Sequence, residues 1–169
     1  MGLLDRCARV RTSAELEAAA ESRLWDGMTL AMGNEPRPLA AIYLLGYVAE
    51  FVLTVAYCRA KPGKVDDVDA QRAAMANKYT DQYQKAYGCR KRNDHELAYL
   101  LFALERERIA DGRALDAALV GALRVKINWI ASNWNERLRY RDVRPTQNEL
   151  WEMVKSVNWV FEARRNLWS

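Results

Sequence analysis

The stretch "RKRNDHEL", from Arg90 to Leu97, places an arginine and a histidine close together. His95 is the single histidine of the chain, and four residues separate it from Arg90. Cleavage of RNA without a metal requires a base with a pKa near neutrality and a cation that stabilises the developing phosphorane charge. Histidine and arginine are suited to these two roles, so Arg90 and His95 are a candidate catalytic pair.

The same stretch has a second interpretation, as a basic loop followed by the start of a helix. The four residues Asn93-Asp94-His95-Glu96 have the form of a capping box with Asn93 as the cap. His95 would then be an ordinary residue of the first helical turn, and Arg90 would lie in the loop before it. We favour this structural interpretation, because arginine and histidine at such spacing are common in basic loops.

A second basic region lies nearer the C-terminus, in "RLRYRDVR". From Arg113 onwards the chain carries ten Lys and Arg against six Asp and Glu, which accounts for the whole net charge of +4. A basic patch that contains aromatic rings can bind the phosphates and bases of RNA or of a nucleotide. The competing interpretation is a solvated charged surface. The candidate contact residues are Trp134, Arg137, Arg139, Tyr140 and Arg141.

Glu50 is the one charged residue of an otherwise uncharged 20-residue segment, Leu39 to Cys58. A membrane span would place this carboxylate near the bilayer centre at a cost of roughly 2.5 kcal/mol or more, so we expect a buried helix in a soluble bundle and no membrane contact. A buried carboxylate needs a partner. We expect Glu50 to pair with Arg139 or Tyr140, either as a structural ion pair or as part of a nucleotide pocket.

Hydrophobic periodicity predicts an all-α chain, because no segment alternates apolar and polar residues over the length of a strand. Two further capping boxes, Thr12 to Glu15 and Thr146 to Glu149, mark helix starts. We expect an up-and-down bundle of four to five main helices in a single domain, 1–169. The expected helices begin near Thr12, Pro38, Asn93, Leu115 and Thr146.

Residues 62–93 are polar, and we interpret them as an insertion of helical or loop structure. Within them Met75, Tyr79, Tyr83 and Tyr87 recur every four residues, which places them on one face of a helix. The tyrosines could stack on bases. We favour packing of the insertion onto the bundle, with the tyrosine hydroxyls at its rim, since aromatic stripes usually indicate burial.

Other features exclude whole classes of function. The three cysteines, Cys7, Cys58 and Cys89, do not have metal-ligand spacing, and one histidine is too few for a typical zinc site. There is no glycine-rich phosphate loop and no nucleophile elbow. We therefore expect no metal and no cofactor. The N-terminus lacks the pattern of a signal peptide, so the expected compartment is the cytoplasm.

Three motifs resemble those of the HEPN superfamily, over roughly residues 13–165. The segment "AAIYLLGYVAEFVLTVAYCRA" resembles the long helix of that superfamily. "HEL" at 95–97 resembles the His-acid-Leu opening of a later helix, and "NWNERLRY" at 133–140 resembles the Trp…Arg-Tyr signature before the final helix in some branches. The matching positions of the long helix are Leu45, Tyr47, Ala49, Glu50 and Leu53.

The resemblance implies a four- or five-helix bundle, often dimeric, that binds RNA or nucleotides. Many HEPN proteins are metal-independent endoribonucleases of toxin–antitoxin and antiphage systems, whereas others have lost catalysis. Catalytic members carry an arginine, and then a histidine four to six residues later, near the last main helix. Here that region holds Arg139, Arg141 and Arg144 but no histidine.

The sequence therefore predicts a HEPN-like homodimer that binds RNA or a nucleotide and whose catalytic motif is degenerate. Two alternatives stay open. One is a metal-independent endoribonuclease that uses Arg90 and His95. The other is a non-catalytic protein-interaction module that partners a nucleotidyltransferase.

Overall fold

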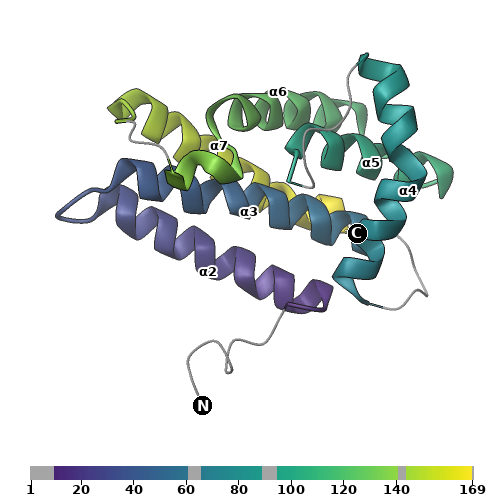
Figure 1. Ribbon diagram of the computed structural model, residues 1–169, viewed down its shortest axis with the longest axis horizontal. Coiled ribbons are helices and arrows are strands. Elements are labelled where there is room, and N and C mark those ends of the chain that lie inside the picture. Colours follow the sequence, from purple (N-terminus) through teal and green to yellow (C-terminus); the bar gives the residue numbers. More distant parts are fainter. Residues whose placement is uncertain (1–9, 61–65, 89–94, 141–143, 169) are drawn as a thin grey trace.

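The computed structural model of the protein describes residues 10–60, 66–88, 95–140 and 144–168. For residues 139 and 140 the description covers the backbone only. Within these residues the chain forms six α-helices and one short 3-10 helix, and no strand (Figure 1). The predicted all-α bundle is confirmed. The elements are α2 (Ser13–Met32), α3 (Pro38–Arg59), α4 (Val68–Tyr87), α5 (Leu97–Ala110), α6 (Ala117–Asn133), η1 (Glu136–Tyr140) and α7 (Gln147–Trp168).

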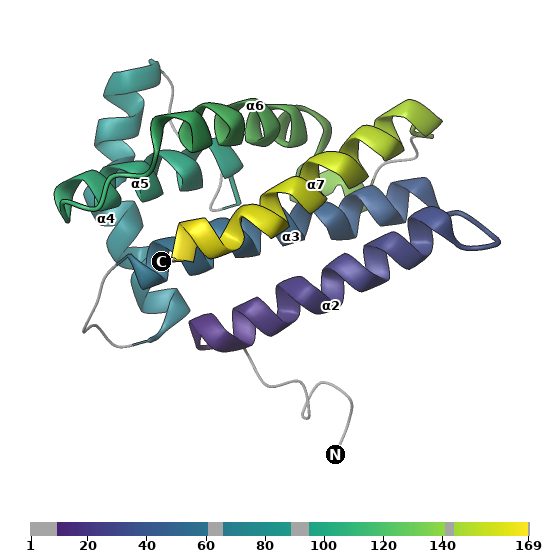
Figure 2. The ribbon, with the colours of Figure 1, turned by 180° about the vertical axis from the view of Figure 1, so that it is seen from behind.

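The apolar helix α3 is the centre of the bundle and contacts α2, α4, α5, α7 and η1. Figures 1 and 2 show α2 and α7 running alongside α3, while α4 crosses near its C-terminal end. In the described chain α3 is also the one helix long and apolar enough to cross a membrane, and 67% of its most apolar window is buried inside the bundle. The predicted burial of this segment is confirmed.

Two predicted capping boxes form as expected. At the start of α2, the Thr12 hydroxyl accepts from the Glu15 backbone N–H, and the Glu15 carboxylate accepts from the Thr12 N–H. At the start of α7, Thr146 and Glu149 exchange the same two contacts. Each box satisfies backbone donors that a helix start leaves without partners.

The third expected capping box begins at Asn93, which lies outside the described residues. α5 begins at Leu97 with Glu96 as its N-cap, rather than at Asn93, and the Glu96 side chain makes no cap hydrogen bond. The Glu96 carboxylate instead accepts a hydrogen bond of 2.7 Å from the hydroxyl of Tyr83 on α4. The acidic side chain that the local pattern assigned to the helix start therefore takes part in a tertiary contact with α4.

The described part of the expected insertion is the helix α4, which Asp67 caps and Gly88 ends in a left-handed conformation with a φ of 68°. Tyr79 and Tyr83 are buried, as we favoured, whereas Tyr87 is 57% exposed. The expectation that the hydroxyls lie at the rim is wrong for Tyr79, whose hydroxyl donates a buried hydrogen bond of 2.5 Å to Glu107 on α5.

Candidate functional site

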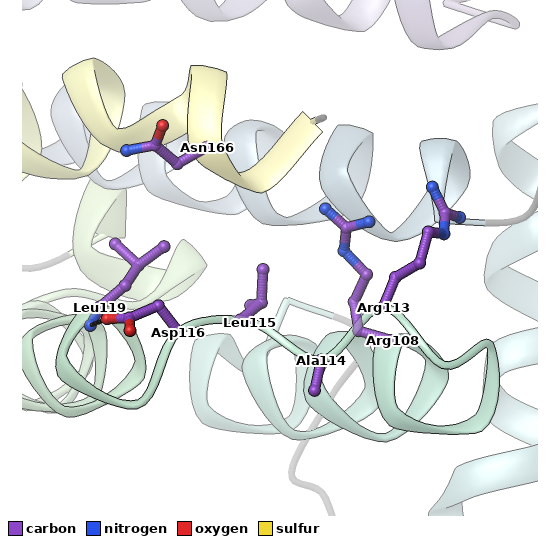
Figure 3. A pocket seen from close by; sticks show the side chains of 7 residues that line it. All are labelled: Arg108, Arg113, Ala114, Leu115, Asp116, Leu119 and Asn166. Atoms are coloured by element: carbon purple, nitrogen blue, oxygen red, sulfur yellow. Dashed lines mark hydrogen bonds between the residues drawn. The ribbon is translucent and has the colours of Figure 1, made fainter.

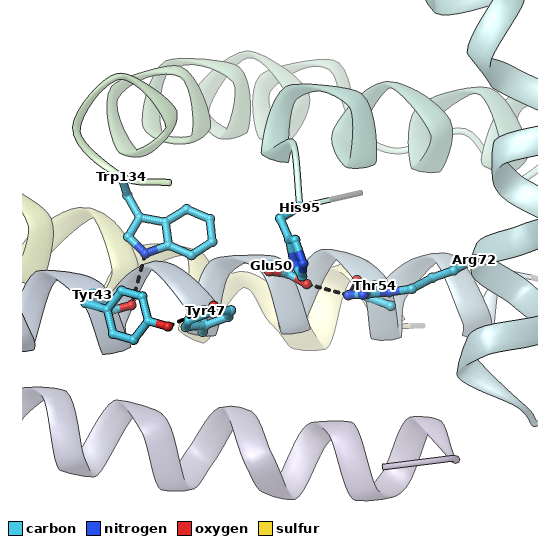
Figure 4. Close-up of polar contacts among 7 residues, drawn as sticks. All are labelled: Tyr43, Tyr47, Glu50, Thr54, Arg72, His95 and Trp134. Atoms are coloured by element: carbon cyan, nitrogen blue, oxygen red, sulfur yellow. Dashed lines mark hydrogen bonds and ion pairs between the residues drawn. The ribbon is translucent and has the colours of Figure 1, made fainter. Parts of the chain in front are cut away.

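A cluster of polar side chains surrounds Glu50, whose own side chain is 1% exposed (Figure 4). One carboxylate oxygen of Glu50 accepts a hydrogen bond of 2.5 Å from Nη2 of Arg72 on α4. The other lies 2.8 Å from Nδ1 of His95, in the turn before α5. Arg72 also donates to the hydroxyl of Thr54, at 3.3 Å. We call Glu50, Thr54, Arg72 and His95 the Glu50 cluster.

The prediction that Glu50 has a charged partner is confirmed, and its partners among the described side chains are Arg72 and His95; the expected partners were Arg139 or Tyr140. The side chains of the latter two lie outside the described residues. Arg72 is the residue that sequence reasoning missed. Its signal was weak: it lies four residues after the buried Val68, on a helix that the polar composition of the segment concealed.

The electrostatics of the cluster favour a protonated imidazole. The hydrogen bond to Glu50 raises the pKa of His95, while burial and the positive charge of Arg72 oppose that change. Because Arg72 already balances the charge of Glu50, protonation of His95 gives the cluster a net positive charge. The His95 side chain is 35% exposed, so a ligand can reach it. A raised pKa suits binding of an anion or donation of a proton better than proton abstraction.

Aromatic side chains border the cluster on α3. The ring of Tyr47 meets the ring of His95 edge-on, with centroids 6.3 Å apart, and meets the ring of Trp134 in the same way at 5.2 Å. The hydroxyls of Tyr47 and Tyr43 lie 3.1 Å apart. Figure 4 shows these two hydroxyls pointing toward one another on α3. The Glu50 cluster is therefore continuous with an aromatic surface.

Trp134 was a predicted contact residue, and the structure buries it to 3% exposure. Its ring lies against Gly46 so closely that a Cβ atom there would approach the ring to 2.2 Å. The indole N–H of Trp134 donates to the carbonyl oxygen of Tyr43 at 3.0 Å. Trp134 therefore fixes the corner between α6 and η1 to α3, and a base cannot stack on it without displacing it.

The other predicted site residues fall into two groups. Arg137 on η1 is 78% exposed, and its guanidinium group pairs with the carboxylate of Glu136 at 3.6 Å. Glu136 contributes to the raised pKa of His95, which places η1 in the electrostatic range of the cluster. Arg90 and Arg141 lie outside the described residues, and Arg139 and Tyr140 are placed there only as backbone of η1.

A cavity of about 580 Å³ lies between α5, α6 and α7, and two arginines line it (Figure 3). Arg108 donates to the carbonyl oxygen of Leu167 at 3.1 Å, near the end of α7. Arg113 donates to the carbonyl oxygen of Ala60 at 2.9 Å, where α3 ends. Cations are favourable at the C-terminal ends of helices, so these guanidinium groups have a structural role in attaching helix ends.

Among the residues that the structure describes, no group of three or more His, Cys, Asp or Glu side chains has a geometry that would hold a metal ion. Comparison with protein-family models, with curated proteins and with solved structures finds no match to the chain. The chemistry of the Glu50 cluster must therefore carry any functional argument.

Proposed function

We propose that this chain is a HEPN-like domain that binds RNA or a nucleotide at the surface formed by the Glu50 cluster and η1. One observation carries the proposal: His95 is a partly exposed imidazole that a fully buried carboxylate orients through a contact of 2.8 Å, while Arg72 neutralises that carboxylate. The same contact raises the pKa of His95. In its protonated form such a group presents an oriented positive charge, which is the feature that phosphate oxygens recognise.

The positions of the HEPN-like motifs support the same proposal. Glu50 comes from the long apolar helix, His95 from the "HEL" motif and Trp134 from the "NWNERLRY" motif. These motifs are far apart in the sequence, yet their side chains meet around Tyr47. A homodimer, a nucleotidyltransferase partner and a role in a toxin–antitoxin or antiphage system follow from the resemblance alone and stay predictions.

A second candidate function is metal-independent RNA cleavage, and one observation favours it. His95 bonded to a carboxylate, with a guanidinium group nearby, is a combination that can donate a proton to a leaving oxygen. In the described residues Arg72 is the arginine bound to this cluster, and Arg90 lies outside them. Binding without cleavage remains the first proposal, because Arg72 is already engaged by Glu50 and Thr54.

The test is RNA binding at several salt concentrations, with His95→Gln and Arg137→Gln. For single strands, the slope of log affinity against log salt falls by about 0.7 for each phosphate contact that is lost, and we expect that change for each variant. Arg124→Gln is the matched control. Arg124 lies on α6, is exposed and pairs with Glu105 of α5. Glu105 is about 12 Å along α5 from the start of that helix, near which His95 lies.

Equal slopes for wild type, His95→Gln and Arg137→Gln would refute the proposal. The same samples, incubated with RNA and a chelator, decide between the two candidate functions. Cleavage by wild type that His95→Gln abolishes, while Arg124→Gln retains it, would replace binding with catalysis as the function of the site.

A further inference from the structure

A second, smaller cavity adjoins the Glu50 cluster on the other side of Tyr47. It has a volume of about 310 Å³ and lies between α2 and α3. This volume is at the lower end of the range for ligand pockets, about 300 to 1,000 Å³, so a small ligand or one part of a larger ligand would fit. The residues that line it are Arg23, Tyr43, Leu44, Tyr47 and Phe51.

Three aromatic rings on successive turns of α3 form one wall of this cavity. The rings of Tyr43 and Tyr47 are almost perpendicular, at 89°, with centroids 5.1 Å apart, and the ring of Phe51 follows 5.8 Å from that of Tyr47. The wall thus offers ring faces, ring edges and two hydroxyls. A flat heterocycle with polar edges can stack on such faces and form hydrogen bonds with such hydroxyls.

Arg23 of α2 supplies a positive charge at the opposite wall. Its side chain is 48% exposed, and its contact with Asp26, at 3.4 Å, is a long surface pair within one helix. Such pairs contribute little, so the guanidinium group can turn toward a ligand at small cost. This situation contrasts with the cavity of Arg108 and Arg113, where both guanidinium groups bind carbonyl oxygens at helix ends.

The cavity and the Glu50 cluster share one side chain. Tyr47 lines the cavity and also makes the edge-on contact with His95 at 6.3 Å. A planar group in the cavity would therefore lie one ring away from the imidazole. Arg23, which lines the cavity, is a cation that a phosphate attached to that group could contact.

We infer that this cavity receives one unpaired nucleobase, so that the ligand of the site is single-stranded RNA or a free nucleotide rather than a duplex. The inference rests on the proposed function, which it extends from phosphate recognition to base recognition. In a duplex the bases are stacked and paired, so none can enter a pocket of aromatic rings without being unstacked.

The experiment compares affinities of the whole chain for three probes of equal length: single-stranded RNA, the same strand without bases, and an RNA duplex. Uridine monophosphate serves as a fourth probe for the free nucleotide. We expect wild type to bind the natural single strand about tenfold more tightly than the strand without bases, which is the effect of stacking one base.

Tyr43→Leu is expected to remove this tenfold preference and to leave the affinity for the strand without bases unchanged. Tyr43→Phe keeps the ring and is expected to retain most of the preference, which separates loss of stacking from a folding defect. Tyr87→Leu removes an exposed tyrosine on α4 and is the matched control, with the preference retained.

Equal affinity of wild type for the natural strand and the strand without bases would overturn the inference and leave the proposed function intact. Tight binding of the duplex, or an equal loss for both strands in Tyr43→Leu, would also overturn the inference. Failure of every probe to bind would refute the proposed function itself. Weaker binding of uridine monophosphate by Tyr43→Leu would support the inference with the free nucleotide as a ligand.

Discussion

Two buried carboxylates, Glu50 on α3 and Glu107 on α5, have closely similar surroundings. Each accepts a hydrogen bond from a cation on α4: Arg72 at 2.5 Å for Glu50 and Lys78 at 3.0 Å for Glu107. Each also contacts a ring group, His95 or Tyr79. Together these two clusters attach α4 to the rest of the bundle.

The two clusters differ in whether the ring group titrates. Burial raises the pKa of Tyr79 above its ordinary value of 10, and the bond to Glu107 adds to that change, so this hydroxyl stays neutral at neutral pH. The pKa of His95 is raised from its ordinary value of 6.5 by the bond to Glu50, and its ring is partly exposed. Burial of an ion pair is therefore common to the two clusters. The feature that differs between them is the partly exposed ring group of the Glu50 cluster, on which the proposed function depends.

The largest effect is expected for Glu50→Ala. Removal of one partner from a buried ion pair typically costs 3–5 kcal/mol, and we expect about 3 kcal/mol because Arg72 and His95 both reach solvent. Glu107→Ala is expected to cost about 2 kcal/mol, since Lys78 is nearly half exposed. Urea denaturation measures both. A wild-type unfolding midpoint for Glu50→Ala would show that the Glu50 cluster does not stabilise the fold.

Substitution of the two cations of α4, Arg72 and Lys78, compares the two clusters further. We expect Arg72→Met to cost about 2 kcal/mol, because it leaves a buried carboxylate with His95 alone, and Lys78→Met to cost less than about 1 kcal/mol. Since the charge of Arg72 lowers the pKa of His95, Arg72→Met should raise that pKa further. The chain has one histidine, so an NMR titration of the imidazole reads this pKa without ambiguity. A lower pKa in Arg72→Met would contradict the described arrangement of charges.

Tyr79→Phe tests the cluster around Glu107, whose ring group does not titrate near neutral pH. The variant removes a hydrogen bond to a charged group, for which we expect a loss of about 1.5 kcal/mol in the free energy of unfolding. The dependence of stability on pH between 6 and 8 should match that of wild type, because the hydroxyl stays protonated throughout. A changed pH dependence would mean that the two clusters are electrostatically coupled.

The smallest effect is the pH dependence that His95 contributes. Its pKa is raised in the folded state, so its bond to Glu50 stabilises the fold fully below pH 6.5, and this contribution is lost as pH rises through the folded-state pKa. His95→Asn should remove this decline from the stability profile above pH 6.5. A profile of the variant parallel to that of wild type would assign the decline to other groups.

Much of the fold could be predicted because it depends on local patterns. The capping boxes at Thr12 and Thr146 need only residues three apart, and the apolar segment around Glu50 indicated its own burial. The start of α5 lies later than the local pattern indicated, at Leu97. The carboxylate of Glu96 binds Tyr83, 13 residues earlier in the sequence, and such a tertiary contact is not encoded in a local pattern.

The candidate site could be predicted in part, for the same reason. The requirement that Glu50 be paired follows from the cost of burying a charge, and His95 was singled out by its type. The identity of Arg72 depends on how α4 crosses α3, which no short pattern encodes. Trp134 was predicted to contact RNA or a nucleotide, but its ring is buried against Gly46, and this packing depends on the absence of a side chain at a position far away in the sequence.

Because Trp134 is attached to α3, the hydrogen-exchange rate of its indole N–H reports local opening of the structure. This proton is bonded to the carbonyl of Tyr43 in a buried contact, so it can exchange with deuterium only when the corner between α6 and η1 detaches from α3. The lifetime of this one resonance in heavy water therefore measures how often the corner that carries Arg137 opens. A ligand bridging His95 and Arg137 would lengthen that lifetime.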